Sequence, residues 1–374
     1  MRGELLNVKG KELHYFAGGN TAKGFYSQFD SNFAVLEKVF ILKGGPGNGK
    51  STLMKNIASA FQGKGYDVEY IHCSSDSESI DGIIFPAIKV GIVDGTAPHI
   101  IEPKVPGAIE EYVNLGVAWD SQQLSAKKDA IIHLISEKEE VYASAYQAFA
   151  DALAIHDEWE SIYISNMDYE KLNSLTEELK SFFFRESILN KEAKVRHRFL
   201  GAATPKGAVD FIPNLTSDIR KRYFLKGRPG SGKSTLLKKL ATTAETKGFD
   251  VEIYHCGFDP NSLDMLIFRE LGIAIFDSTS PHEYFPNREG DEIIDLYNVA
   301  IFPETDEMYE EQISKISERY REKMNEGIAH LAEAKTLHDE LETIYKKATD
   351  FKVIEDIQRK IKDTIHLFEK ELAE

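Results

Sequence analysis

The chain has 374 residues, 42% of them hydrophobic and 28% charged, values typical of a water-soluble protein with two or three domains. Its formal net charge of −16 argues against broad binding to nucleic acid or anionic membranes, which both require a basic surface. The sequence shows neither a secretion signal nor a run of apolar residues long enough to span a membrane, and its two cysteines do not suggest a disulfide framework. We therefore expect a cytoplasmic protein.

Short apolar runs and helical patterns alternate along the first hundred residues. The runs 39–44, 67–73 and 89–94 predict three buried strands. Residues 52–65 predict a helix after the first strand, and residues 77–88 predict a short helix before the third. This alternation predicts an α/β fold with a parallel sheet flanked by helices.

The pattern changes after about residue 120. Residues 121–165 contain neither glycine nor proline and repeat apolar residues at helical spacing, and residues 306–346 are similar. Both stretches predict long amphipathic helices that pair as hairpins, against each other or against their own domain. The C-terminal fifth of the chain has the same helical, highly charged character, and these helical arms are where we expect a protein partner to bind.

The two halves of the chain are copies of one unit. An offset of 183 aligns residues 2–107 with residues 185–290 without a gap, and 42 of the 106 pairs are identical. A later offset of 182 matches IHDEWESIY (155–163) with LHDELETIY (337–345). Two large repeats indicate paired domains rather than a solenoid, and we expect a pseudo-twofold pair within one chain.

The repeat predicts two consecutive domains, each with an α/β core followed by a helical arm. The expected ranges are 1–183, with its core at about 1–120 and its arm at about 121–183, and 184–374, with its core at about 184–304 and its arm at about 305–374.

Each copy carries the pattern Gly-x-x-x-x-Gly-Lys-Ser between an apolar run and a helical stretch. Glycines let successive backbone N–H groups turn toward a phosphate, and the following helix presents its N-terminus to the anion. Lys50 and Lys233 are predicted to reach the β- and γ-phosphates, and the hydroxyls of Ser51 and Ser234 to bind Mg²⁺. The residues predicted to hold the nucleotide are Gly44, Gly45, Pro46, Gly47, Asn48, Gly49, Lys50, Ser51, Thr52, Gly227, Arg228, Pro229, Gly230, Ser231, Gly232, Lys233, Ser234 and Thr235.

With these loops in a strand–loop–helix context, both copies resemble the P-loop NTPase superfamily. The tandem arrangement is similar to uncharacterised duplicated families of ATPases or nucleotide kinases. The resemblance implies ATP and Mg²⁺ as ligands and two tandem P-loop NTPase domains, each with a long helical extension.

An aspartate ends the third predicted strand of each copy. Asp94 and Asp277 are predicted to hold Mg²⁺ directly or through water, although an aspartate at such a place can also cap a turn. Neither is followed by the glutamate that orients water in many P-loop ATPases, because Gly95 and Ser278 come next. Slow hydrolysis, a base from elsewhere and transfer to an acceptor other than water all remain open.

Two pairs of residues are candidates for the missing group. Asp76 and Asp259 follow the second strand at the carboxyl edge of the sheet, where they can act as general bases or cap a turn. His99 and His282 end the stretches DGTAPH and DSTSPH, where they can contact a γ-phosphate or water, or serve as hydrogen-bonded structural histidines.

Other repeated residues also leave several interpretations open. Lys23 and Lys206 lie in TAKG and TPKG, loops that supply a lysine to a phosphate, close over the nucleotide or form a structural turn. His156 and His338 lie on the apolar stripes of their helices and are expected to be interface histidines. The first 184 residues contain one arginine and the remainder eleven, so an arginine finger for the first site would come from the second copy; surface drift between lysine and arginine explains the same bias.

The leading functional interpretation is a Mg²⁺-dependent ATPase with two nucleotide sites. Nucleotide occupancy would control how the two halves and their helical arms are arranged relative to each other. A nucleotide or small-molecule kinase is the second interpretation, and it requires an acceptor pocket. A nucleotide-dependent switch or scaffold with little turnover is the third.

Overall fold

The computed structural model describes residues 9–371, and the chain forms two compact units. Unit 1 comprises Met1–Gly18, Asn32–Ala143 and His330–Glu374, and unit 2 comprises Gly19–Ser31 and Ser144–Ala329. The sequence predicts two consecutive domains that meet near residue 183, which instead lies inside unit 2. Each unit therefore combines the α/β core of one copy with helical residues from the other.

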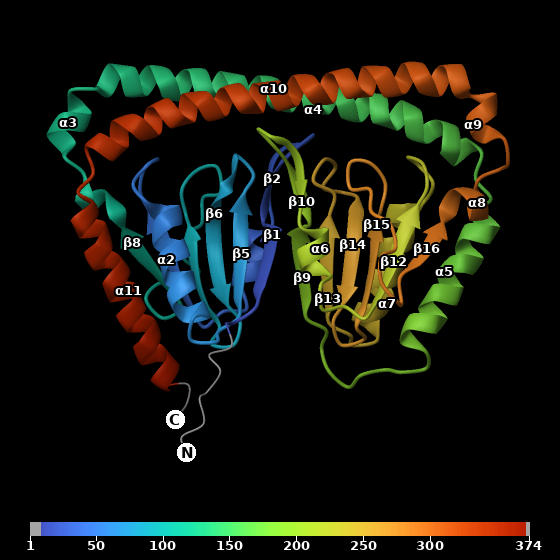
Figure 1. Ribbon diagram of the computed structural model, residues 1–374, viewed down its shortest axis with the longest axis horizontal. Helices are drawn as coiled ribbons and strands as arrows, with labels where there is room; N and C mark the ends of the chain where they lie inside the picture. The colour runs from blue at the N-terminus through green and yellow to red at the C-terminus, as the bar shows by residue number, and fades with distance from the viewer. Residues whose placement is uncertain (1–8, 372–374) are drawn as a thin grey trace. The chain divides into compact units, whose positions relative to one another are not determined.

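Unit 1 is built on a six-stranded sheet with the order β1-β5-β6-β7-β4-β8 (Figure 1). All neighbouring strands are parallel except β6, which runs antiparallel to β5 and β7. The elements are β1 (Glu12–Phe16), β4 (Lys38–Lys43), α2 (Lys50–Gln62), β5 (Val68–Cys73), β6 (Asp76–Phe85), β7 (Val90–Asp94), β8 (Glu110–Asn114), the 3-10 helix η1 (Leu115–Ala118), α3 (Ser121–Ser125) and α11 (Phe351–Glu371).

Unit 2 repeats this plan with the strand order β16-β12-β15-β14-β13-β9, in which β14 is the antiparallel strand. A hairpin of β2 (Gly18–Thr21) and β3 (Gly24–Ser27), encoded in the first copy, precedes it in the chain. The other elements are α5 (Tyr169–Phe184), β9 (Val195–Phe199), β10 (Gly201–Thr204), β11 (Gly207–Asp210), α6 (Ile212–Leu215), β12 (Lys221–Lys226), α7 (Lys233–Thr246), β13 (Val251–His255), β14 (Leu263–Phe268), β15 (Ile273–Asp277), β16 (Glu292–Asp295), α8 (Leu296–Ala300) and α9 (Thr305–Met308).

The short helix predicted at residues 77–88 is wrong, because these residues form most of strand β6. Every residue from Ile80 to Phe85 is buried, so the strand lacks the alternation of apolar and polar residues that marks a half-exposed strand. The sheet is consequently mostly parallel rather than wholly parallel. The three predicted strands and the helix after the first strand are present as β4, β5, β7 and α2.

The predicted long helices are present as α4 (Lys128–Ser165) and α10 (Glu310–Lys347). Both continue across a unit boundary, which falls after Ala143 in α4 and after Ala329 in α10. The short helix α1 (Phe29–Phe33) crosses a boundary as well. None of the helices within residues 9–371 has both the length and the apolarity needed to cross a membrane.

The last helix of each arm packs on the α/β core of the other copy. In unit 1, α11 lies against α2 and η1, and Ile354, Ile361 and Ile365 enter the core around α2 (Figure 1). In unit 2, α5 lies against α7 and α8, and its Leu172 and Phe183 enter the core there. The apolar stripes of these helices therefore complete the core of the other copy, whereas the sequence predicts packing against each other or against their own domain.

Candidate functional site

The first glycine-rich loop links β4 to α2 and has the backbone of a phosphate-binding turn. Gly49 caps the helix in the left-handed region at φ 87°, which favours glycine. Asn48 is buried beneath the loop, and a Cβ on Gly44 would lie 2.1 Å from its side-chain nitrogen. Gly232 and the buried Ser231 repeat this arrangement between β12 and α7. Thr52 and Thr235 lie exposed in the first helical turn that follows each loop.

The predicted phosphate-binding lysine lies at the mouth of each loop, beside the predicted metal aspartate. In unit 1, Lys50 Nζ donates hydrogen bonds to the carbonyls of Gly45 (2.7 Å) and Gly44 (3.3 Å). The same nitrogen lies 3.5 Å from Asp94 Oδ2, and both side chains are largely buried. The structure thus brings together the lysine and the aspartate that the sequence places 44 residues apart.

Unit 2 has the same geometry. Lys233 Nζ donates to the carbonyls of Arg228 (3.1 Å) and Gly227 (3.4 Å) and lies 3.5 Å from Asp277 Oδ2. Because the two units share no residues, the agreement indicates that the arrangement belongs to the loop and strand sequences themselves.

The serine after each lysine is positioned by the antiparallel strand. Ser51 Oγ accepts a hydrogen bond from the backbone N–H of Ile80 (3.1 Å), and Ser234 Oγ accepts one from Leu263 (3.0 Å). Since Ile80 lies in β6 and Leu263 begins β14, the strand that the sequence pattern missed in each copy holds a predicted metal ligand.

Asp94 and Asp277 cap turns, as one of their two interpretations predicts, while their role as Mg²⁺ ligands stays a prediction. Oδ1 of Asp94 accepts from the backbone N–H (2.9 Å) and hydroxyl (2.6 Å) of Thr96, and Asp277 binds Thr279 in the same way (3.0 and 2.6 Å). One carboxylate oxygen therefore caps a turn while the other faces the loop lysine. The turn fixes the orientation of the carboxylate.

A second acid lies opposite each of these aspartates on the neighbouring antiparallel strand, and it was not among the predicted site residues. The pairing of Gly82 with Val93 in antiparallel register places Asp81 opposite Asp94. The corresponding register in β14 and β15 places Asp264 opposite Asp277. Asp81 and Asp264 are 5% and 8% exposed, and they align with each other in the repeat, within the apolar runs IDGIIF and LDMLIF. This aligned pair of buried acids was the signal available in the sequence.

Burial disfavours the charged form of these two acids. It raises the pKa of Asp81, and together with the nearby charge of Asp277 it raises the pKa of Asp264 to about 6. The oxygens of two neighbouring carboxyl groups are hard ligands, the type that Mg²⁺ prefers.

The two predicted histidines lie beside carboxylates. His99 is buried, and its Nε2 lies 3.8 Å from Asp81 Oδ1. His282 Nδ1 lies 2.9 Å from Asp210 Oδ2. Burial alone would lower the pKa of His282, but the hydrogen bond to Asp210 and the nearby carboxylates outweigh it and raise the pKa. The histidines thus neighbour the acids of each site.

Asp76 and Asp259 act as turn caps. Asp76 accepts hydrogen bonds from the backbone N–H of Glu78 (3.2 Å) and the hydroxyl of Ser79 (3.0 Å), and Asp259 makes the equivalent pair of bonds. Each also faces a lysine, at 3.7 Å for Lys335 and 3.5 Å for Lys23. These contacts favour the turn-capping interpretation over that of a general base. Lys23 lies in the turn between β2 and β3, so unit 2 places a first-copy lysine beside a second-copy acid.

A helical segment from the other copy packs against each glycine-rich loop. In unit 1, a Cβ on Gly47 would lie 2.6 Å from the carbonyl oxygen of Glu342, which belongs to α10. A Cβ on Gly45 would lie 3.0 Å from the ring of Tyr345. In unit 2, a Cβ on Gly230 would lie 2.5 Å from the carbonyl oxygen of Glu160 in α4. Each glycine-rich loop is therefore covered on one side by a long helix, α10 in unit 1 and α4 in unit 2. The sequence did not predict these contacts.

Most of the second-copy arginines have partners within unit 2. Arg222 forms a two-point ion pair with Asp291, and Arg269 pairs with Glu252. The guanidinium of Arg228, in the second loop, pairs with Asp306 (2.6 Å). These contacts favour structural roles over that of an arginine finger.

The histidine–cysteine pairs at the ends of β5 and β13 have structural roles as well. His72 Nδ1 donates to the carbonyl of Ser77 (3.0 Å), and its Nε2 lies 2.9 Å from His14 Nδ1. Burial raises the pKa of Cys73 and of Cys256 well above that of an ordinary thiol. Neither thiol has the character of a reactive thiolate.

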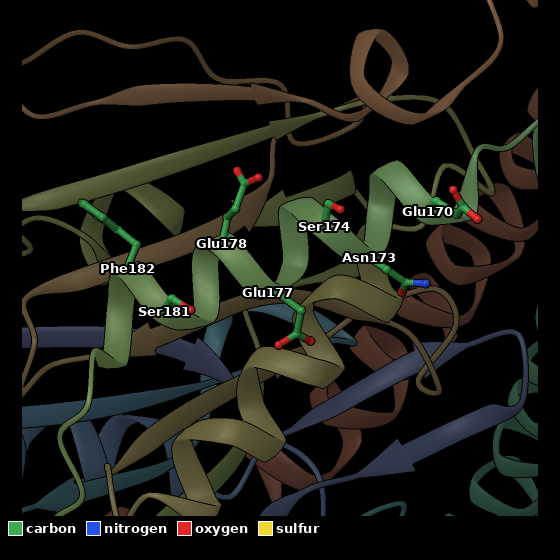
Figure 2. Close-up of a pocket in the computed structure, with 7 residues that line it drawn as sticks. All are labelled: Glu170, Asn173, Ser174, Glu177, Glu178, Ser181 and Phe182. Atoms are coloured by element: carbon green, nitrogen blue, oxygen red, sulfur yellow. The ribbon is translucent and has the colours of Figure 1, made fainter.

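A surface hollow lies along one face of α5, and no residue of either glycine-rich loop lines it. Figure 2 shows the side chains of Glu170, Glu177 and Glu178 projecting from this helix, with Phe182 at one end. Every residue that lines the hollow comes from this single helix, so no second element converges on it. We assign it no part in nucleotide binding.

One comparison with known proteins gives a match. Residues 39–183, less than half of the chain, match the family AAA domain (dynein-related subfamily). No curated protein and no solved structure matches the chain. The matched range begins in β4 and contains the first glycine-rich loop, Asp81 and Asp94, and an AAA domain indicates ATP binding. This match places residues 39–183 in the AAA/P-loop NTPase superfamily, and the geometry of the first glycine-rich loop agrees with it.

Proposed function

We propose that the chain is a Mg²⁺-dependent ATPase with one nucleotide site in each unit, at Gly44–Thr52 and at Gly227–Thr235. The observation that carries the proposal is the repeated approach of the loop lysine to the strand-end aspartate, at 3.5 Å in both units. A glycine-rich turn without a ligand has no need of this charge pair or of a serine hydroxyl held beside it. The second loop lies outside the matched range, and its assignment rests on this repeated geometry.

The donor set fits Mg²⁺. Ser51 Oγ and Asp94 would hold the ion in unit 1, directly or through water, with Asp81 across the sheet, and Ser234 and Asp277 would do so in unit 2. When bound, Mg²⁺ would neutralise charge that develops during transfer of the γ-phosphoryl group.

The residues of the chain supply the remaining contacts. The backbone N–H groups of the loop and the N-terminus of α2 or α7 surround the phosphates. The ammonium of Lys50 or Lys233 lies at the loop mouth and can donate hydrogen bonds to phosphate oxygens there. The arm residues beside Gly45 and Gly47 exclude water from one side of the first loop and so strengthen these charged interactions.

A kinase that transfers phosphate to a nucleotide or small molecule is the second candidate. The observation that favours it is the buried acid opposite each metal aspartate, combined with the absence of a glutamate after Asp94 and Asp277. Asp81 or Asp264 could then take the proton of an acceptor hydroxyl. Release of ADP that increases on addition of an acceptor would distinguish this activity from hydrolysis.

Measurement of ATP binding with Mg²⁺ tests the proposal, using Lys50→Ala, Lys233→Ala and the double variant. Loss of a charge-assisted hydrogen bond to phosphate costs about 1.5–3 kcal/mol, equivalent to roughly 10- to 150-fold in affinity. We expect two tight sites in the wild type, one in each single variant and none in the double variant.

Lys55→Ala and Lys238→Ala are the matched controls, because these exposed lysines lie on the same helices at equivalent positions of the two copies. Each control should bind two nucleotides. Two tight sites in both single loop variants would contradict the proposal.

A further inference from the structure

The segment His-Asp-Glu-x-Glu occurs once in each long helix, at 156–160 in α4 and at 338–342 in α10. Unit 2 contains the first segment together with the second glycine-rich loop, and unit 1 contains the second segment together with the first loop. Each loop is thus accompanied by a segment that is encoded in the other copy.

The main chain of the segment touches the loop in both units. A Cβ on Gly230 would lie 2.5 Å from the carbonyl oxygen and 2.9 Å from the Cα of Glu160. A Cβ on Gly47 would lie 2.6 Å and 3.0 Å from the same two atoms of Glu342. The same glutamate of the segment therefore meets the same glycine of the loop twice, in units that share no residues. Glycine is the residue that allows so close an approach, and its φ of +67° or +72° also favours glycine.

A histidine one helical turn earlier lies next to this glutamate. His156 Nδ1 is 3.7 Å from Glu160 Oε1, and His338 Nε2 is 3.6 Å from Glu342 Oε1. Phe258 and Tyr320 pack around the His156 ring at centroid distances of 6.1 and 5.6 Å. The histidine is therefore held in place by packing and can orient the carboxylate.

Burial lowers the pKa of His156, and the charge of the loop lysine Lys233 contributes to this shift, whereas the carboxylate of Glu160 opposes it. The side chains of Glu160 and Glu342 remain 36% and 27% exposed, so water can reach both carboxylates. Lys346 Nζ donates to Oε2 of Glu342 (2.7 Å), so in unit 1 the oxygen for water is Oε1, beside His338.

We propose that Glu160 and Glu342 position the attacking water at the glycine-rich loop of their unit, each oriented by its histidine neighbour. They would supply the carboxylate that Gly95 and Ser278 do not provide after the metal aspartates. Each copy of the repeat then completes the site of the other copy. This inference rests on the proposed ATPase function and assigns the water-positioning residue of the same sites.

In the proposed step, the water oxygen forms a bond to the γ-phosphorus of ATP. The bond between that phosphorus and the oxygen that bridges to the β-phosphorus breaks, and ADP leaves with the electron pair. The glutamate carboxylate accepts the proton of the water and then returns it to solvent. The products are ADP and inorganic phosphate, and the step needs no oxidant or further co-reactant.

Single-site chains give the sharpest test. In Lys50→Ala only the second loop remains intact, and Glu160→Gln in that chain should lower kcat for ATP about 100-fold while the ATP dissociation constant changes less than threefold. In Lys233→Ala the same result is expected for Glu342→Gln. The matched controls are Glu158→Gln and Glu340→Gln, at the central glutamate of each segment, which is exposed in both. Neither control should lower kcat more than twofold.

Five results would count against the inference in distinguishable ways. Equal losses of kcat in Glu160→Gln and Glu158→Gln would overturn it, and so would a rise in the dissociation constant that accounts for the whole loss. In the Lys50→Ala chain, Glu342→Gln should leave kcat nearly unchanged. A loss as large as that caused by Glu160→Gln would overturn the assignment of each acid to its unit. A wild-type chain that binds ATP but releases no phosphate in a single turnover would overturn the water-positioning role and leave ATP binding intact. Failure of the wild type to bind ATP would refute the proposed function itself.

Discussion

The contact between Gly230 and Glu160 leads to a quantitative prediction for Gly230→Ala. The new Cβ would lie 2.5 Å from the Glu160 carbonyl oxygen, so the two backbones would have to separate by about 0.9 Å to reach an ordinary contact of 3.4 Å. Both partners are main chain, which cannot rotate away as a flexible side chain can. Overpacking of this kind costs about 1–3 kcal/mol.

The positive φ of Gly230 adds a separate cost that a control can subtract. A non-glycine residue in the left-handed region costs about 1–2 kcal/mol. Gly207 has φ +97° and nothing within 4 Å of its Cβ position, so Gly207→Ala has the backbone cost without the clash. We therefore expect Gly230→Ala to lower the free energy of unfolding of unit 2 by about 1–3 kcal/mol more than Gly207→Ala does.

Urea unfolding followed by tryptophan fluorescence can report on unit 2 alone. The chain has two tryptophans, Trp119 in unit 1 and Trp159 in unit 2, so Trp119→Phe leaves a single probe in the unit of interest. The comparison of the two alanine variants in this background gives the energy of the clash. Equal losses of stability in both variants would refute the reasoning, because the contact with Glu160 would then carry no energy.

Three further predictions concern the cores and the buried histidines. Arg222→Ala should destabilise unit 2 by about 3 kcal/mol, because it removes the two-point ion pair of the buried Asp291 carboxylate and leaves it only two backbone N–H groups and the more distant Arg288 (3.6 Å). Arg222→Lys should recover only part of this loss in the same urea assay. Leu172→Ala should cost about 2–5 kcal/mol, since this 4% exposed side chain packs against the second glycine-rich loop; an unchanged urea midpoint would show that α5 does not complete this core. Burial lowers the pKa of His72 to about 4, so the unfolded chain takes up a proton below pH 6.5 that the folded chain does not. The free energy of unfolding should therefore fall by up to about 3 kcal/mol as the pH drops from 6.5 to 4, and His72→Gln should flatten this part of the pH profile.

The sequence predicts the strands and helices with strong patterns and misses β1, β8 and β6, the last of which is buried from Ile80 to Phe85. The strands β4, β5 and β7 and the long helices follow from apolar runs and from helical spacing. Strand β6 was missed because a run buried on both faces has no alternation, and Gly82 and Asp81 within it lower its apparent strand character. The antiparallel pairing of β6 with β5 and β7 was missed for the same reason.

The exchange of the arms could not be predicted from one sequence. An amphipathic stripe shows that a helix needs an apolar partner, but it does not identify that partner. The buried Ile361 of α11 would have the same spacing whether it packed on its own copy or on the other. Contacts between one copy's loop and the other copy's helix, such as that between Gly47 and Glu342, therefore could not be predicted from the sequence.

The loop residues were predictable because their chemistry is local. Glycine, lysine and serine at fixed spacing specify a phosphate-binding turn, and the structure brings Asp94 to Lys50 as that pattern requires. Asp81 was missed because it reaches the site from the strand that was mispredicted, although its alignment with Asp264 inside an apolar run was visible in the repeat.

Because each unit includes helical residues of the other copy, the two units are completed in a fixed order during translation. Unit 2 ends at Ala329, whereas unit 1 needs residues 330–371 to cover the face of α2, although its sheet is translated first. At about 5–20 residues per second, the apolar face that α11 covers would wait about 10–45 s between synthesis of Ala143 and of α11. Throughout that interval the nascent chain exposes the surface of an unfinished core. Unit 1, whose sheet is synthesised first, is therefore completed last. The uncovered face of α2 is the surface that a chaperone would bind.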